Sequence, residues 1–267
     1  MSYQGIARPI MQFLSHFEIP KVLEIGTERG QTTLPLCHNL TLLGRPFLYD
    51  GVDIVIRPEL SHSLGAMAGI FLKDFEPGRR MYNIRLFEEN SLDFLPKLIK
   101  DSAKYNLILL DGDHNYHSVY NELIMLDKLT LPSTLIVCDD YNTHWSDKDL
   151  FYSEREEYRG VQSATPKTIE KKSGVRPAIE DFVENTEGKW AIASASTATW
   201  GPDARPSDYC ILYQPQAVLD VNMFLPPGLW TMNSQIMEVY FNKQECPEVR
   251  QNLMKNLEYA YSREGDK

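Results

Sequence analysis

The chain has 267 residues, of which 43% are hydrophobic, and it carries a formal net charge of −10. This length and apolar content suffice for one elaborated domain with a full core. The acidic balance argues against nucleic acid as a partner, because a phosphate backbone attracts basic surfaces. No apolar run reaches membrane-spanning length, and the first residues lack the layout of a signal peptide. We therefore expect a cytoplasmic protein without a membrane partner.

Strand-like and helix-like stretches alternate along the first half of the chain. Strands are expected at Lys21–Ile25, Phe47–Val52, Met81–Phe87, Leu107–Leu110 and Leu135–Cys138, and helices at Thr32–Leu43, Leu92–Lys100 and Ser118–Lys128. The alternation predicts an α/β fold with a doubly wound, mostly parallel sheet and right-handed crossovers, as in Rossmann-like domains.

The pattern changes after Tyr141. Residues 141–173 show no periodicity, and we interpret them as a lid segment, because a loop of that length in a compact domain is usually functional or disordered. A helix at Arg176–Asn185 and strands at Trp190–Ala193 and Tyr209–Tyr213 follow, and the two strands predict an antiparallel edge hairpin. The main domain is expected to span residues 1–215.

Residues 216–267 form a predicted carboxyl-terminal extension. Its last helix is expected to begin at Pro247, where apolar side chains recur every four residues. This helix packs either on the domain or on a second subunit, so a homo-oligomer is one of two arrangements that the sequence leaves open.

Acidic side chains follow two of the buried strands. Asp111 and Asp113 come after the run NLILL, and Asp139 and Asp140 come after TLIVC. Ligands of open α/β sheets bind beyond the carboxyl ends of the strands, so these four carboxylates are expected to face one crevice. So much negative charge in one place indicates a cation. The alternative is helix capping, for which one such residue per site would be enough.

The turn after the first strand, EIGTERGQTT, has the shape of a nucleotide-binding turn. Its glycines allow a close backbone approach, and the following helix offers unpaired N–H groups. It is not the dinucleotide motif GxGxxG, because Glu28 occupies a required glycine position, and its acidic residues suit a cationic cofactor better than a pyrophosphate. The candidate cofactor-binding residues at the strand ends are Glu24, Gly26, Thr27, Gly30, Thr32, Asp53, Asn90 and Ser91. The alternative is that Gly26 and Gly30 are ordinary turn glycines and that Asp53 is a solvated strand end.

These motifs, above all LLDGDHNY followed by IVCDDY, resemble those of class I S-adenosylmethionine-dependent methyltransferases. The resemblance is strongest to the macrocin O-methyltransferase branch, metal-dependent enzymes that methylate sugar hydroxyls of natural products, and it covers about residues 20–195. It implies that S-adenosylmethionine is the cofactor and that Glu24, Gly26, Asp53 and Ser91 contact it, with Asp111 as a further candidate. It also implies that Mg²⁺ is held by Asp111, Asp139 and Asp140.

A base is needed to take the proton of the acceptor hydroxyl. His114 and Asp113 are the candidates, since either can face the crevice from a tight turn after the strand. We favour His114, because an ordinary histidine titrates near neutral pH, and Asp113 is then placed to orient it.

The leading functional hypothesis is an O-methyltransferase that transfers a methyl group to a hydroxyl of a sugar or vicinal diol in a small metabolite, in natural product biosynthesis. A catechol-type O-methyltransferase or a cephalosporin hydroxylase-like enzyme would use the same scaffold. A non-catalytic cofactor-binding subunit is the third alternative, and the four intact carboxylates argue against it.

Overall fold

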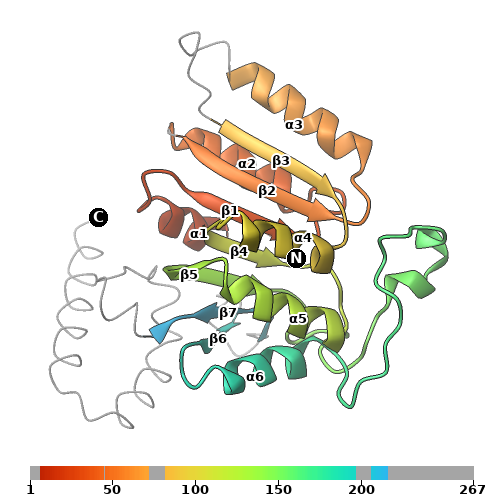
Figure 1. Ribbon diagram of the computed structural model, residues 1–267. Coiled ribbons are helices and arrows are strands. Elements are labelled where there is room, and N and C mark those ends of the chain that lie inside the picture. Colours follow the sequence, from red (N-terminus) through yellow and green to blue (C-terminus); the bar gives the residue numbers. More distant parts are fainter. Residues whose placement is uncertain (1–6, 45, 72–81, 197–205, 216–267) are drawn as a thin grey trace, which may run out of the picture.

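The structure is a computed structural model that describes residues 7–44, 46–71, 82–196 and 206–215 (Figure 1). The expected last helix and the carboxyl-terminal extension lie outside these residues. Among the described residues, the strands are β1 (Lys21–Ile25), β2 (Phe47–Asp53), β3 (Tyr82–Glu88), β4 (Tyr105–Leu110), β5 (Thr130–Cys138), β6 (Ala191–Ser196) and β7 (Pro206–Tyr213). The α-helices are α1 (Ala7–Leu14), α2 (Thr33–Leu42), α3 (Pro58–Phe71), α4 (Ser91–Lys100), α5 (Tyr116–Asp127) and α6 (Val175–Asn185).

The described strands form one seven-stranded sheet in the order β3-β2-β1-β4-β5-β7-β6. The first five strands pair in parallel, and β7 joins β5 and β6 in antiparallel pairs. The predicted fold class, a mostly parallel α/β sheet with an antiparallel edge hairpin, is confirmed. Strand order reverses between β1 and β4, and at such a switch point the neighbouring crossovers leave a crevice beyond the strand ends.

Two apolar cores enclose the sheet. Side chains of α1, α2 and α3 pack on one face, against strand residues such as Val22 and Leu109. Side chains of α4, α5 and α6 pack on the other face, against residues such as Leu23 and Ile108, and Figure 1 shows these three helices side by side. Every residue of β4 is buried, which is why its sequence is apolar almost throughout.

Asparagine side chains begin two of the helices at the crevice. Asn90 Oδ1 accepts a hydrogen bond from the N–H of Leu92 at the start of α4, and Asn115 Oδ1 accepts one from the N–H of Ser118 at the start of α5. These caps satisfy N–H groups that a helix leaves unpaired. They fix the two helix starts beside the ends of β3 and β4.

Two helices were not expected from the sequence. Helix α3 begins with Pro58 at its first position and Glu59 in its first turn, both of which favour a helix start. Its sequence, PELSHSLGAMAGIF, has no clean apolar stripe, so the periodicity that marks other helices is absent. Helix α1 is only eight residues long. Within the described residues, no helix has the length and apolar character needed to cross a membrane.

Candidate active site

A cavity of about 320 Å³ lies at the carboxyl ends of the parallel strands. Its walls come from the turns after β1, β2, β3, β4 and β5, as the strand-end argument predicted. All the predicted site residues line it except Gly30. Gly30 has a φ of 78°, and a Cβ there would lie 2.5 Å from Leu60 Cδ1, so this glycine serves the packing of the turn against α3.

Gly26 lies where the turn after β1 approaches the turn after β4. Its φ is 86°, and a Cβ at this position would lie 2.0 Å from the carbonyl oxygen of Asp111. A side chain is therefore impossible without moving backbone. The structural reason for this glycine is the close approach of the turn after β1 to the turn after β4.

Asp53, at the end of β2, holds the turn after β1 in place. Its Oδ2 accepts hydrogen bonds from the N–H groups of Thr27 at 2.8 Å and Glu28 at 2.7 Å, and its Oδ1 accepts one from the N–H of Val55 at 3.1 Å. Two carboxylate oxygens offer about four acceptor sites, so capacity remains for a ligand in the cavity.

Glu24 is 2% exposed and shares the cavity wall with Thr32. Its Oε2 accepts hydrogen bonds from Thr33 Oγ1 at 2.9 Å and from the hydroxyl of Tyr49. Burial raises the pKa of Glu24 to about 7, although both hydrogen bonds favour the ionised form. One carboxylate oxygen of Glu24 therefore forms its hydrogen bonds within the protein interior.

Asn90 and Ser91 lie where β3 meets α4, but neither is a simple ligand-facing side chain. Asn90 caps α4 and donates from Nδ2 to the carbonyl oxygen of Ser163 at 2.7 Å and to Thr165 Oγ1 at 3.0 Å. Ser91 Oγ donates to Oε1 of the buried Glu122. The side chain of Asn90 thereby ties the lid segment to the sheet, a role that its position in the sequence did not indicate.

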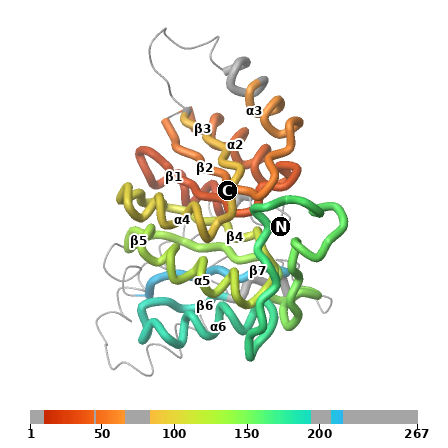
Figure 2. Tube along the Cα trace, turned by 45° about the vertical axis from the view of Figure 1, so that its right-hand side comes forward, coloured from red at the N-terminus to blue at the C-terminus, as the bar shows by residue number. Residues whose placement is uncertain are grey.

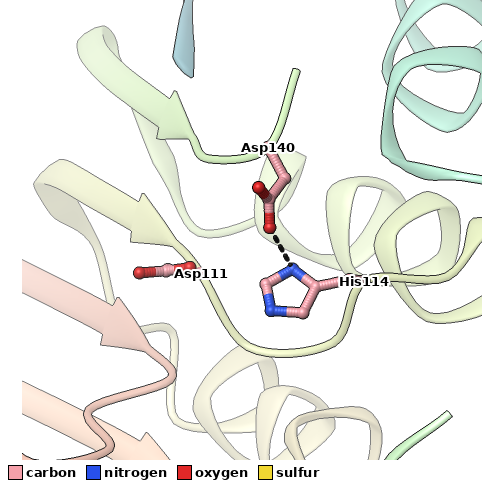
Figure 3. A group of neighbouring side chains, drawn as sticks. All are labelled: Asp111, His114 and Asp140. Atoms are coloured by element: carbon pink, nitrogen blue, oxygen red, sulfur yellow. Dashed lines mark ion pairs between the residues drawn. The ribbon is translucent and has the colours of Figure 1, made fainter. Parts of the chain in front are cut away.

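Three potential cation ligands converge from the turns after β4 and β5 (Figure 3). Asp111, His114 and Asp140 each offer a ligand atom within 4.8 Å of those of the other two. His114 Nδ1 lies 2.7 Å from Asp140 Oδ2. Asp140 has a left-handed φ of 57°, which turns its side chain toward His114. The grouping includes His114, whereas the resemblance implied Asp139 as the third ligand.

Asp139 nevertheless lies close to this group of side chains. It is 9% exposed and lines the cavity. Burial and, second, the charge of Asp139 raise the pKa of Asp111 well above its usual value. Crowded buried carboxylates of this kind are destabilised when ionised together, and a cation would relieve them.

His114 and Asp140 favour each other's charged forms. Burial opposes protonation of His114, but the contact with Asp140 and the neighbouring carboxylates outweigh it, so the pKa of His114 is raised. Burial likewise acts against ionised Asp140, and the contacts with His114 and Thr143 outweigh it, so the pKa of Asp140 is lowered. Asp113 faces the cavity too, and its Oδ2 accepts from Ser118 Oγ at 2.6 Å. Because Asn115 caps α5, capping does not account for Asp113.

Residues 23–141, which extend from within β1 to just beyond β5, match a family model described as a methyltransferase domain. The match, which covers less than half of the chain, indicates a methyltransferase. The prediction of a methyltransferase is confirmed. A comparison with curated proteins found no significant match.

The chain also has distant similarity in fold to solved structures. The cofactor-bound Rv0187 from MTB is 14% identical, with a TM-score of 0.45 and 80% of each chain covered. CalS11, a TDP-rhamnose 3'-O-methyltransferase of calicheamicin biosynthesis, is 10% identical, with a TM-score of 0.47, 79% of this chain and 77% of CalS11 covered. The mycinamycin-pathway methyltransferase MycE, with Mg, SAH and mycinamycin VI, is 13% identical, with a TM-score of 0.45 and coverage of 79% and 48%.

The lid segment runs along the carboxyl-terminal edge of the sheet (Figure 2). It contains two short 3₁₀ helices, η3 (Tyr152–Glu154) and η4 (Glu156–Tyr158). Tyr152 and Tyr158 line the cavity, with ring centroids 4.8 Å apart, and the Tyr152 ring lies 5.9 Å from that of His114. The lid segment thus supplies two aromatic side chains to the wall of the cavity.

Hydrogen bonds fasten the lid segment at both sides of the cavity. Asp149 Oδ1 accepts from the N–H groups of Tyr116 and Gly174, each at 2.8 Å, and the N–H of Leu150 donates to the carbonyl oxygen of His114 at 2.9 Å. On the far side, Ser163 Oγ donates to the carbonyl oxygen of Ile54 at 3.1 Å. These contacts, and the positions of Tyr158 and Glu122, were not predicted, because no local motif marks contacts between such distant positions.

Proposed function

We propose that the protein is an S-adenosylmethionine-dependent O-methyltransferase that uses Mg²⁺ and acts on a sugar or vicinal diol of a small metabolite, as in the macrocin O-methyltransferase branch. The observation that carries the proposal is one cavity with two chemically different halves. The turn after β1 and Asp53 form one half, and Asp111, His114 and Asp140 form the other.

The first half suits a cationic cofactor with a ribose. Asp53 keeps acceptor capacity at the end of β2, where ribose hydroxyls can reach it. Glu28 closes the turn where a pyrophosphate would need glycine, and Glu24 adds a second carboxyl group. A sulfonium cofactor meets no charge conflict there, and the methyltransferase domain match covers all these residues.

The second half suits a hard cation. Asp111 and Asp140 can bind Mg²⁺, with Asp139 beside them, because carboxylate oxygens are ligands that this ion prefers. When bound, the ion would position an acceptor hydroxyl and increase its acidity.

His114 is the proposed base. Because its Nδ1 faces Asp140, its Nε2 is left to accept the hydroxyl proton. S-adenosylmethionine, when bound, would supply the methyl group for the acceptor oxygen, and His114 would hold the proton that this oxygen releases. Asp113 supports the imidazolium through its negative charge.

The tyrosine pair favours a second candidate, a catechol-type acceptor. Tyr152 and Tyr158 present rings to the cavity, against which a flat aromatic acceptor could stack. Sugars also pack on aromatic rings, so the two candidates differ in substrate and not in the cofactor or the base.

Mass spectrometry tests the proposal. The protein, S-adenosylmethionine and Mg²⁺ are incubated with glycosides and with catechols, and a gain of one methylene in the acceptor is measured. We expect methylation of a glycoside, loss of turnover in excess chelator, and recovery with Mg²⁺. Turnover of catechols alone would favour the second candidate, and full activity in chelator would reject the cation.

A comparison of two variants tests the assignment of the base. His114→Asn should lower turnover by roughly 10²-fold or more, as expected for loss of a general base. Asp113→Asn should have a smaller effect, because Asp113 acts only through its charge. The reverse order, measured at saturating cation and cofactor, would make Asp113 the base.

A further inference from the structure

Asp140 has an uncommon backbone conformation in the stretch after β5, residues 139–146. Its φ of 57° lies in the left-handed region, which residues other than glycine seldom occupy. Such a conformation persists where the surrounding structure holds it. The carboxylate of Asp140 contacts His114 and Thr143, but these contacts do not hold the backbone that follows Asp140. The support for that backbone comes from another element.

The start of α6 is in direct backbone contact with the stretch 139–146. The N–H groups of Val175 and Arg176 donate to the carbonyl oxygens of Trp145 at 3.1 Å and Ser146 at 3.0 Å. A helix leaves its first N–H groups without partners inside the helix, so this stretch supplies the acceptors. Gly174 precedes the helix, and a Cβ there would lie 2.6 Å from the carbonyl oxygen of Ser146. The position of the stretch therefore depends on α6.

Arg176 reaches from the start of α6 to the two residues that follow Asp140. Its Nε donates to the carbonyl oxygen of Tyr141 and its Nη2 donates to Asn142 Oδ1, each at 2.9 Å. Its Cζ also lies 5.3 Å from the centroid of the Tyr141 ring. A guanidinium holds its N–H groups in a planar fork, so two such bonds fix the orientation of the backbone that they hold.

The partners of Arg176 indicate orientation and not charge pairing. Its partners among the described residues are a carbonyl, an amide and an aromatic ring, none of which carries a charge. All three belong to Tyr141 and Asn142. The Arg176 side chain therefore holds the peptide next to Asp140 and does not neutralise an acid.

We propose that Arg176 is a positioning residue of the candidate cation site, which keeps the Asp140 carboxylate turned toward Asp111 and His114 (Figure 3). The inference rests on the proposed function, in which Asp111 and Asp140 bind Mg²⁺. Residues that orient metal ligands without binding the metal typically change metal affinity by about 10- to 100-fold when they are replaced.

Calorimetric titration of Mg²⁺ into the protein, without cofactor or acceptor, tests this role. Arg176→Met keeps an unbranched apolar side chain and removes both hydrogen bonds, and it should raise the dissociation constant for Mg²⁺ roughly tenfold or more. Loss of a positive charge would by itself strengthen the binding of a cation, so weaker binding identifies a loss of positioning. The dissociation constant for S-adenosylhomocysteine should stay close to the wild-type value, because Arg176 does not line the cavity.

A second variant and a matched control complete the comparison. Arg176→Lys keeps the charge, but a single amine cannot reproduce the planar fork, so this variant should also weaken Mg²⁺ binding and replaces Arg176→Met if the latter does not fold. Lys172→Met is the matched control. It removes an equal charge beside α6, where Lys172 pairs with Asp181, and it should keep the wild-type affinity for Mg²⁺.

Each failure has its own signature. Wild-type affinity for Mg²⁺ in folded Arg176→Met, or in Arg176→Lys where the methionine variant does not fold, overturns the positioning role. Equal weakening of Mg²⁺ and S-adenosylhomocysteine binding would mean a general loosening of the fold and would overturn it as well. If the wild-type protein binds no Mg²⁺, the cation under the proposed function is itself rejected, and this inference is rejected with it.

Discussion

Glu24 shows how burial at the cavity links protonation to stability. Its pKa is about 7 in the folded protein, with burial as the main cause, against an ordinary value of 4.5. The folded state therefore holds this proton at pH values where the unfolded chain has released it. Stability must fall as pH rises from about 4.5 to about 7, because over this range the folded state binds more protons than the unfolded state.

Glu24→Gln should remove this pH dependence. The amide keeps an acceptor for Tyr49 and Thr33 but cannot ionise. Between pH 4.5 and pH 8 the wild-type free energy of unfolding should fall by up to roughly 3 kcal/mol more than that of the variant. Urea denaturation at several pH values measures the difference.

The matched control for Glu24 is an exposed glutamate. Glu18→Gln should follow the wild-type curve, because Glu18 is exposed. Identical pH profiles for Glu24→Gln and the wild-type protein would show that Glu24 titrates normally. Other buried acids contribute equally to both proteins and cancel from the comparison.

At the scale of elements, the lid segment depends on one aspartate. Asp149 Oδ1 accepts from the N–H groups of both Tyr116 and Gly174, so it links the start of the lid segment to α5 and to the start of α6. Asp149→Ala would leave two part-buried N–H groups without their partner, at a cost of about 1–3 kcal/mol for each group that remains buried. We expect local opening of the lid segment before global unfolding.

Hydrogen exchange measures this opening. Amides of residues 150–173 should exchange faster in Asp149→Ala, while those of β4 and β5 should be unchanged. Asp147→Ala is the control, because Asp147 is exposed and only two residues away. Equal exchange in the two variants would contradict the linking role of Asp149.

The elements differ in how well the sequence predicts them. The parallel strands were predictable because runs such as YNLILL are apolar on both faces, as a buried parallel strand must be. Helix α3 was not, since its apolar residues do not form a stripe. The strand-end carboxylates were predictable because they directly follow these apolar runs.

The arrangement within the site was harder to predict. The pairing of His114 with Asp140 depends on a left-handed backbone conformation at Asp140, which no pattern announces for a non-glycine residue. The contact of Asn90 with Ser163 joins positions 73 residues apart. The sequence was enough to predict which side chains line the cavity. The contacts between those side chains depend on the folded backbone.

At the scale of the whole molecule, the carboxylates of the cavity are part of a net charge of −10. Mg²⁺ should therefore stabilise the folded protein as well as support turnover. At a concentration of about 100 times the dissociation constant, binding contributes about 2.7 kcal/mol, which corresponds to a rise of roughly 5 °C or more in Tm.

Thermal unfolding with Mg²⁺ tests this effect, with NaCl of equal ionic strength to separate binding from screening. Asp111→Asn should reduce the shift, because it removes a proposed ligand. A shift that NaCl reproduces, or one that Asp111→Asn retains in full, would rule out a specific cation site.

The contact between Gly26 and the carbonyl oxygen of Asp111 has a consequence for how such a protein can diversify. The two turns meet backbone to backbone, and the pairing of Ile25 with Leu110 fixes them in register. The lid segment, by contrast, is one continuous excursion between β5 and α6. Exchange of that stretch would remodel one wall of the cavity and leave the spacing of the two turns unchanged. The choice of bound molecule can therefore evolve by replacement of a single insert, while the geometry of the two turns is inherited intact.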